Sequence, residues 1–133
     1  MNIEQLMVEV NRTAREKGWY DPPKTFGEVC LMFHTEASEI VEEYRKLPEG
    51  WPINSNSYYS EVYTGERVDQ FRIFEGSAWG CLAKPEGVAA ELADLIIRVL
   101  DTAQQDGIDL VKAIREKMEF NATRPFRHGG KRL

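Results

Sequence analysis

One segment near residue 90 of this 133-residue chain restricts the fold more than any other, because it is apolar around almost its whole helical circumference. Its apolar residues are Val88, Ala89, Ala90, Leu92, Ala93, Leu95, Ile96, Ile97, Val99 and Leu100. Its charges, at Glu91, Asp94, Arg98 and Asp101, fall in one stripe about 80° wide. A helix this apolar is expected at the centre of a fold. Carboxylates on it then lie in or beside a low-dielectric interior, where an unpaired charge is costly.

Helical periodicity predicts four helices, over residues 3–17, 25–47, 85–105 and 109–121. Thr25 and Glu28 have capping-box spacing, Asp109 is a suitable N-cap, and Pro85 suits a first helical turn. Residues 48–84 are an insertion, irregular or with a small hairpin at 61–73 around Thr64-Gly65-Glu66. In the basic tail, 125–133, Pro125 and His128-Gly129-Gly130 are expected to end regular structure. We therefore expect an all-α bundle forming a single domain, 1–133.

Composition narrows the class of protein. The net charge of −5 argues against broad nucleic-acid binding, and no run approaches the roughly 20 apolar residues that span a bilayer. The chain starts with an acidic, helix-like segment, so no signal peptide is expected. Cys30 and Cys81 lack CxxC spacing and are expected to be reduced thiols, which predicts a cytoplasmic protein. A chain this short gains considerably from a partner subunit that extends its core.

A second set of acids lies on the predicted helix at 25–47. Glu36, Glu39 and Glu43 fall within about 60° of one another on its surface. Alone, they are compatible with a solvated acidic face. Beside the buried helix, however, these acids and Glu91 and Asp94 require protonation, a basic partner or a metal. Since Arg98 can pair with only one of them, a metal is the better explanation, and an all-carboxylate set favours Mg²⁺ or Mn²⁺ over zinc.

The spacing of these acids resembles a known signature. Glu36-Ala-Ser-Glu39 and Glu91-Leu-Ala-Asp94 resemble the ExxE…ExxD motif of the MazG-like all-α nucleoside triphosphate pyrophosphohydrolases. The segment 84–94 resembles the family's third-helix entry, and Lys117-x-x-x-Asn121-x-x-Arg124-Pro125 resembles its downstream substrate element. The separation between the two acidic motifs, residues 40–90, is longer than the family's usual spacing.

This resemblance implies a helical bundle that assembles as a homodimer or homotetramer. It implies Mg²⁺-dependent cleavage of a (d)NTP between the α and β phosphates into (d)NMP and pyrophosphate, in nucleotide-pool housekeeping or dUTP removal. Glu36, Glu39, Glu91 and Asp94 would be the catalytic metal ligands, and one of them would accept a proton from the attacking water. Lys117, Asn121 and Arg124 would bind the substrate, although an ordinary solvated helix end has the same residues. The aromatic insertion would close over the nucleotide, form a subunit contact or simply pack.

Rival functions have weaker support in the sequence. A di-iron bundle needs Glu-x-x-His pairs, which neither Glu36 nor Glu91 begins. His34-Thr35-Glu36 has the HxE pattern of zinc deaminases, but no PCxxC follows it. No Walker loop or GxSxG elbow is present. The remaining alternative is a non-catalytic helical interaction module whose acids are solvated.

Overall fold

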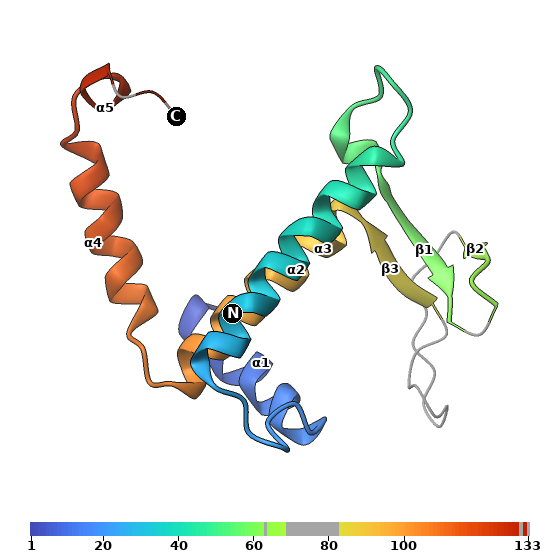
Figure 1. The fold of residues 1–133 in the computed structure, drawn as a ribbon, viewed down its shortest axis with the longest axis horizontal. Coiled ribbons are helices and arrows are strands. Elements are labelled where there is room, and N and C mark those ends of the chain that lie inside the picture. The colour runs from blue at the N-terminus through green and yellow to red at the C-terminus, as the bar shows by residue number, and fades with distance from the viewer. Residues whose placement is uncertain (63, 69–82, 131, 133) are drawn as a thin grey trace. The chain divides into compact units, whose positions relative to one another are not determined.

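A computed structural model describes residues 1–62, 64–68, 83–130 and 132 (Figure 1). Its helices are α1 (Ile3–Glu16), α2 (Phe26–Arg45), α3 (Val88–Gln105), α4 (Leu110–Ala122) and the four-residue α5 (Arg127–Gly130), with a 3-10 turn at Ile53–Ser55. Its strands are β1 (Ser57–Glu61), β2 (Arg67–Val68) and β3 (Ala83–Gly87). None of the helices in this described part of the chain is long and apolar enough to cross a bilayer.

The four long helices were predicted from sequence, and their local signals act as expected. Thr25 caps α2 in a capping box with Glu28, and the Asp109 side chain accepts a hydrogen bond from the Lys112 N–H at the start of α4. α1, α2 and α4 begin and end within two residues of the predicted bounds. The prediction that regular structure stops in the tail was wrong, because the chain forms the short helix α5 there.

The expected all-α fold was also wrong, because the chain contains a three-stranded antiparallel sheet with the order β2-β1-β3. β1 pairs with β2 through Tyr59 and Val68, and the connection between these strands contains Thr64-Gly65-Glu66. The hairpin predicted there is therefore confirmed, although its first strand starts at Ser57 and its predicted residues 69–73 lie outside the described residues. The fold is mixed: long helices with one small sheet.

Pro85 explains why the third strand was mistaken for a helical turn. Pro85 lies in the middle of β3, opposite Tyr59 of β1. β3 is an edge strand of the described sheet, and an edge strand tolerates a residue that has no N–H to donate. Helix α3 consequently begins at Val88, three residues after the predicted start.

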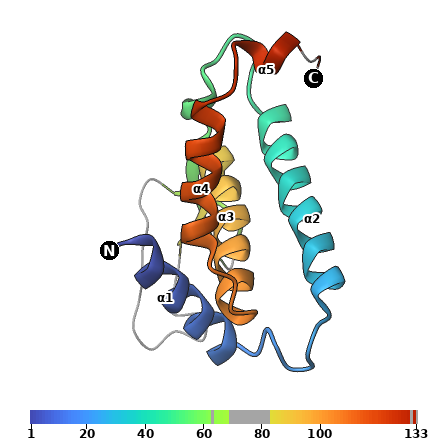
Figure 2. The same cartoon turned by 90° about the vertical axis from the view of Figure 1, so that its left-hand side faces the viewer.

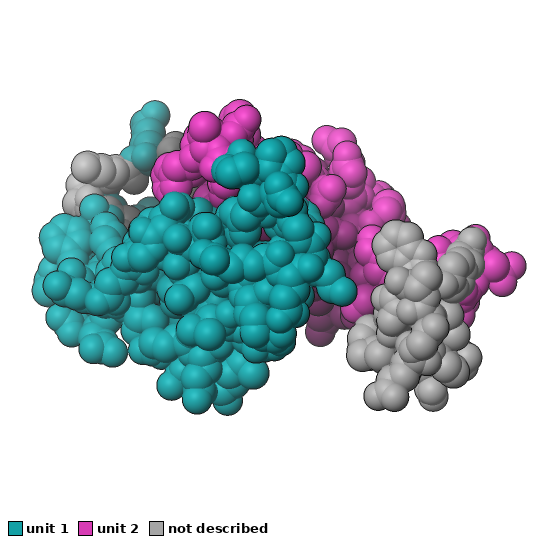
Figure 3. All heavy atoms as spheres, turned by 90° about the horizontal axis from the view of Figure 1, so that it is seen from below, with its two compact units in different colours: residues 1–23, 99–133 teal, residues 24–98 magenta. Residues whose placement is uncertain are grey.

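The chain divides into two compact units, coloured separately in Figure 3. Unit 1 consists of residues 1–23 and 99–133, and its core is formed by Met7, Leu100 and Ala103. A polar network joins α1 to the last part of α3: the Asn11 side chain donates to Asp101 (2.8 Å), and the Tyr20 hydroxyl donates to the other Asp101 oxygen (2.7 Å).

Unit 2 consists of residues 24–98 and contains α2, the sheet and residues 88–98 of α3. β3 contacts α2 and leads directly into α3. α2 and this part of α3 run antiparallel (Figure 2): Glu36 pairs with Arg98, whereas Glu43, further along α2, lies near Glu91. This unit contains both of the predicted carboxylate motifs.

Candidate metal site

The structure brings the four predicted carboxylates together in unit 2. Carboxylate oxygens of Glu36, Glu91 and Asp94 all lie within 4.8 Å of one another. Glu39 does not belong to this group of converging oxygens, but it lies close enough to Glu36 and Glu91 for both of them to influence its pKa. Two acids from the middle of α2 thus meet two acids from the first turns of α3. The sequence pattern predicted this convergence, which depends on the antiparallel pairing of the two helices.

Burial and mutual repulsion disfavour the charged forms of these carboxylates. Glu36 is only 4% exposed. Partial burial raises the pKa of Glu39, and the negative charge of Glu36 raises that pKa further. Desolvation also raises the pKa values of the half-buried Glu91 and of Asp94, which is still exposed, with added repulsion from Glu39 and Glu36 respectively. A cation bound among these oxygens would remove the repulsion between their charged forms.

Two cations of unit 2 already compensate part of this charge. The Arg98 Nε donates to a Glu36 oxygen, as anticipated for one of the acids. Lys84 lies on β3, and its positive charge partly offsets the rise in the pKa values of Glu91 and Asp94. Its ammonium group also lies 3.5 Å from a Glu86 oxygen. Arg98 thus pairs with the most deeply buried acid, Glu36, while the exposed Lys84 pairs with Glu86.

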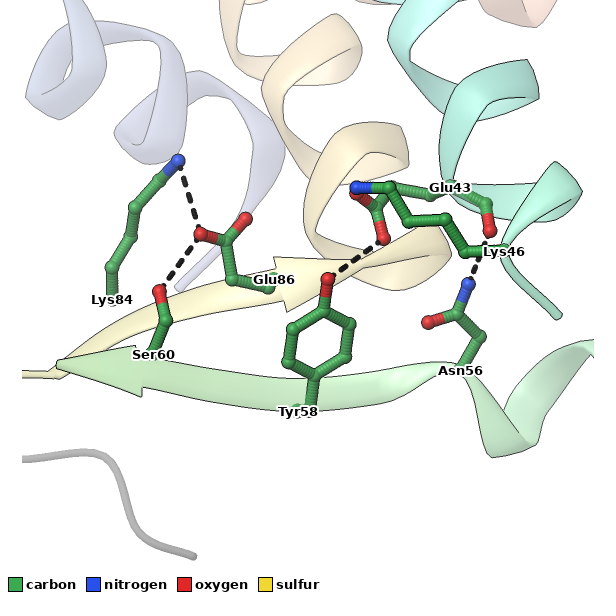
Figure 4. Close-up of polar contacts among 7 residues, drawn as sticks. All are labelled: Glu43, Lys46, Asn56, Tyr58, Ser60, Lys84 and Glu86. Carbon is green, nitrogen blue, oxygen red and sulfur yellow. Dashed lines mark hydrogen bonds and ion pairs between the residues drawn. The ribbon is translucent and has the colours of Figure 1, made fainter. Parts of the chain in front are cut away.

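A second acidic group, which the sequence did not reveal as a group, shares Glu91 with the first. Oxygens of Glu43, Glu86 and Glu91 lie within 4.8 Å of one another. Figure 4 shows how β1 contacts two of these acids: the Tyr58 hydroxyl donates to Glu43 (3.2 Å) and the Ser60 hydroxyl donates to Glu86 (2.9 Å). Glu43 also pairs with Lys46.

The sequence predicted the position of only some members of this second acidic group. Glu43 falls on the same helical face as Glu36, so the angular argument already placed it beside the site. Glu86 gave no such signal, because its orientation depends on β3 being a strand. The aromatic insertion was expected to cover a nucleotide, contact a subunit or pack. The hydroxyl of Tyr58, an aromatic residue of the insertion, hydrogen-bonds to Glu43, while residues 63 and 69–82 of the insertion lie outside the described residues. These three alternatives therefore stay predictions.

The predicted substrate residues lie in unit 1. Lys117 and Asn121 are one turn apart on α4, and Arg124 follows the helix. Lys117 and Arg124 both lie over the ring of Phe120, at 5.4 and 5.2 Å from its centroid. All three predicted residues are exposed. Their role toward a substrate stays a prediction.

The donor set could hold a metal ion, because three carboxylate oxygens lie within 4.8 Å of one another. In an octahedral Mg²⁺ site neighbouring ligand oxygens lie about 2.9 Å apart, so these side chains would have to move closer together to bind one ion. The ligand atoms are all hard carboxylate oxygens, a donor set that is not specific to Mg²⁺. His34, the histidine of the HxE pattern noted in the sequence, lies on α2 and is exposed.

Comparisons with protein-family models, with curated proteins and with solved structures found no match to this chain. The resemblance to the MazG-like enzymes therefore rests on the order and spacing of the motifs in the sequence.

Proposed function

We propose that this chain is a Mg²⁺-dependent nucleoside triphosphate pyrophosphohydrolase, which converts a (d)NTP into (d)NMP and pyrophosphate. The observation that carries the proposal is the convergence of Glu36, Glu91 and Asp94, with Glu39 beside them, from two antiparallel helices. An all-carboxylate site of this kind favours Mg²⁺, which binds few protein ligands and takes phosphate oxygens as further ligands. The ordered ExxE and ExxD motifs add the reaction type.

In the proposed mechanism, Glu36, Glu39, Glu91 and Asp94 would hold the ion. When bound, Mg²⁺ neutralises phosphate charge and lowers the pKa of a bound water. One of the four carboxylates accepts the proton that the attacking water loses. Arg98 keeps Glu36 in place and balances its charge while it is buried.

The negatively charged phosphates of the substrate need positively charged side chains near them. Within unit 2, Lys84 is exposed and electrostatically coupled to Glu91 and Asp94. From the sequence motif, we further propose Lys117, Asn121 and Arg124 as substrate-binding residues, with Arg124 making a bidentate contact. The proposed function also includes a homodimer or homotetramer and a cytoplasmic location, where nucleoside triphosphates and reduced thiols occur.

The decisive test is hydrolysis of a panel of standard and modified triphosphates with Mg²⁺, scored separately for pyrophosphate and orthophosphate. We expect pyrophosphate as the primary product, and we expect Glu39→Gln and Asp94→Asn to lower kcat at least about 100-fold. Glu42→Gln is the matched control, because Glu42 is an exposed neighbour on the same helix. Orthophosphate as the primary product would contradict the reaction. Absence of both hydrolysis and Mg²⁺ binding would favour an interaction module.

A further inference from the structure

Asn56 is a buried polar residue that the proposed mechanism does not use. It lies between the 3-10 turn Ile53–Ser55 and strand β1, in the segment that the sequence marked only as an insertion. It is 7% exposed, and the residues that it contacts, Glu43 and Val88, are buried as well. A buried amide persists in a fold when its hydrogen-bonding groups have partners.

The partners of Asn56 are the two helices that carry the carboxylate motifs. Its side-chain N–H donates to the Glu43 carbonyl oxygen in the last turn of α2 (2.6 Å). The backbone carbonyl oxygen of Asn56 accepts from the backbone N–H of Val88, the first residue of α3 (3.1 Å). The Glu43 carbonyl also accepts from the N–H of Lys46, the C-cap residue of α2 (3.1 Å), whereas the first N–H groups of a helix, such as that of Val88, have no partner within the helix. One residue therefore binds the end of α2 and the start of α3.

Gly87 allows this close approach. Its φ is +98°, and a Cβ atom built on it would lie 2.1 Å from the Asn56 carbonyl oxygen. A side chain at position 87 would therefore push Asn56 away from the start of α3. The turn from β3 into α3 is thus fitted closely against Asn56.

This link lies close to the acids. Glu91 is three residues after Val88, and one of its oxygens lies within 4.8 Å of a Glu43 oxygen. Because residues along a helix advance about 1.5 Å and turn about 100° each, a slip of α3 by one residue would turn Glu91 and Asp94 away from Glu36 and Glu39. The two hydrogen bonds of Asn56 oppose such a slip.

We propose that Asn56 is a positioning residue for the metal site, which holds α2 and α3 in the register that brings both carboxylate pairs to one cation. This inference rests on the proposed metal-dependent function. In this inference the insertion has a role other than covering the nucleotide. Its residue Asn56 sets the separation and register of the two helices that carry the ligands. Removing an interaction that orients a metal ligand typically weakens metal binding 10- to 100-fold.

The test measures Mn²⁺ binding to the full-length chain without nucleotide, by calorimetry or by the EPR signal of free Mn²⁺, well below the unfolding temperature of each variant. We expect Asn56→Ala to raise the Kd for Mn²⁺ at least about 10-fold. Asn54→Ala, which changes an exposed asparagine in the neighbouring 3-10 turn, should leave that Kd unchanged. Saturating Mn²⁺ should restore most of the kcat of Asn56→Ala, because the ligands themselves remain.

A merely stabilising role for Asn56 predicts a different result. Folded Asn56→Ala would then have a lower unfolding temperature but the Mn²⁺ affinity of the wild type, and that outcome would overturn the inference. If Asn56→Ala does not fold, Asn56→Ser leaves a smaller cavity and is measured in the same way. If the wild type itself fails to bind Mn²⁺, the proposed function fails instead, so the two failures are distinct.

Discussion

Glu39 carries a charge that its surroundings disfavour, and Glu28, on the same helix, carries one that its surroundings favour. Partial burial and the neighbouring Glu36 raise the pKa of Glu39. The capping hydrogen bonds from Thr25 lower the pKa of Glu28. Stability depends on pH with opposite signs for these two groups, because a raised pKa in the folded state means that folding takes up protons and a lowered pKa means that folding releases them.

The pair gives a test of the site's repulsion at single residues. In metal-free protein, the charge on Glu39 destabilises the fold as pH rises from the ordinary glutamate value of about 4.3 through the raised pKa. Glu39→Gln should therefore unfold at a higher temperature than the wild type at pH 7.5, and this advantage should disappear near pH 4. Thermal unfolding in EDTA, followed by circular dichroism at both pH values, measures it.

Glu28→Gln provides a control of opposite sign. It removes a charge whose stabilisation is present at neutral pH and lost as pH falls through the lowered pKa of Glu28. This variant should be less stable than the wild type at pH 7.5, with a smaller deficit near pH 4. If Glu39→Gln is also less stable than the wild type at pH 7.5, the acids do not repel each other as described.

At the scale of elements, the sequence predicted what local interactions determine and missed what pairing determines. Thr25 and Asp109 cap the helices that they were expected to cap, since a cap needs only the next three residues. Strand β3 was missed because its partner, β1, is more than 20 residues earlier in the chain. Without that partner, Lys84-Pro85-Glu86 resembles a helix start. Because β3 was predicted as part of a helix, the orientation of Glu86 could not be predicted either. The four predicted carboxylates could be found from helical spacing and from the antiparallel pairing of two helices.

The junction between β3 and α3 can be tested with two glycines. Gly87 and Gly65 both have positive φ, but only Gly87 lacks space for a Cβ atom, since nothing lies within 4 Å of one built on Gly65. Gly65→Ala should cost about 1–2 kcal/mol, the ordinary penalty of this backbone region. Gly87→Ala should cost at least about 1 kcal/mol more, because the Asn56 carbonyl must move. Urea denaturation of both variants measures the difference, and equal losses would show that the junction is not tightly fitted.

At the scale of the whole molecule, the described residues leave large apolar side chains exposed on their helices. On α3, Leu92 is 46% and Ile96 is 56% exposed. These two residues are one turn apart, on the side of the helix roughly opposite Glu91 and Asp94. Single exposed apolar residues are ordinary. The sequence, however, predicted a buried central helix here, and that prediction is wrong for this face of α3 in the single chain. The proposed homo-oligomer would cover this face with a second copy of the chain.

Light scattering coupled to size exclusion tests this assembly directly. The wild type should have a mass two or four times 15.3 kDa. Ile96→Glu should shift the mass toward the single chain, because it places a charge within the apolar contact, where an unpaired charge costs several kcal/mol. Gln104→Glu adds the same charge at an exposed polar position of α3 and should leave the mass unchanged. A wild type that stays at 15.3 kDa at high concentration would exclude the second copy. If Ile96→Glu dissociates the assembly yet still binds Mn²⁺ with unchanged affinity, each chain holds its cation with its own carboxylates, as the convergence of α2 and α3 within unit 2 requires.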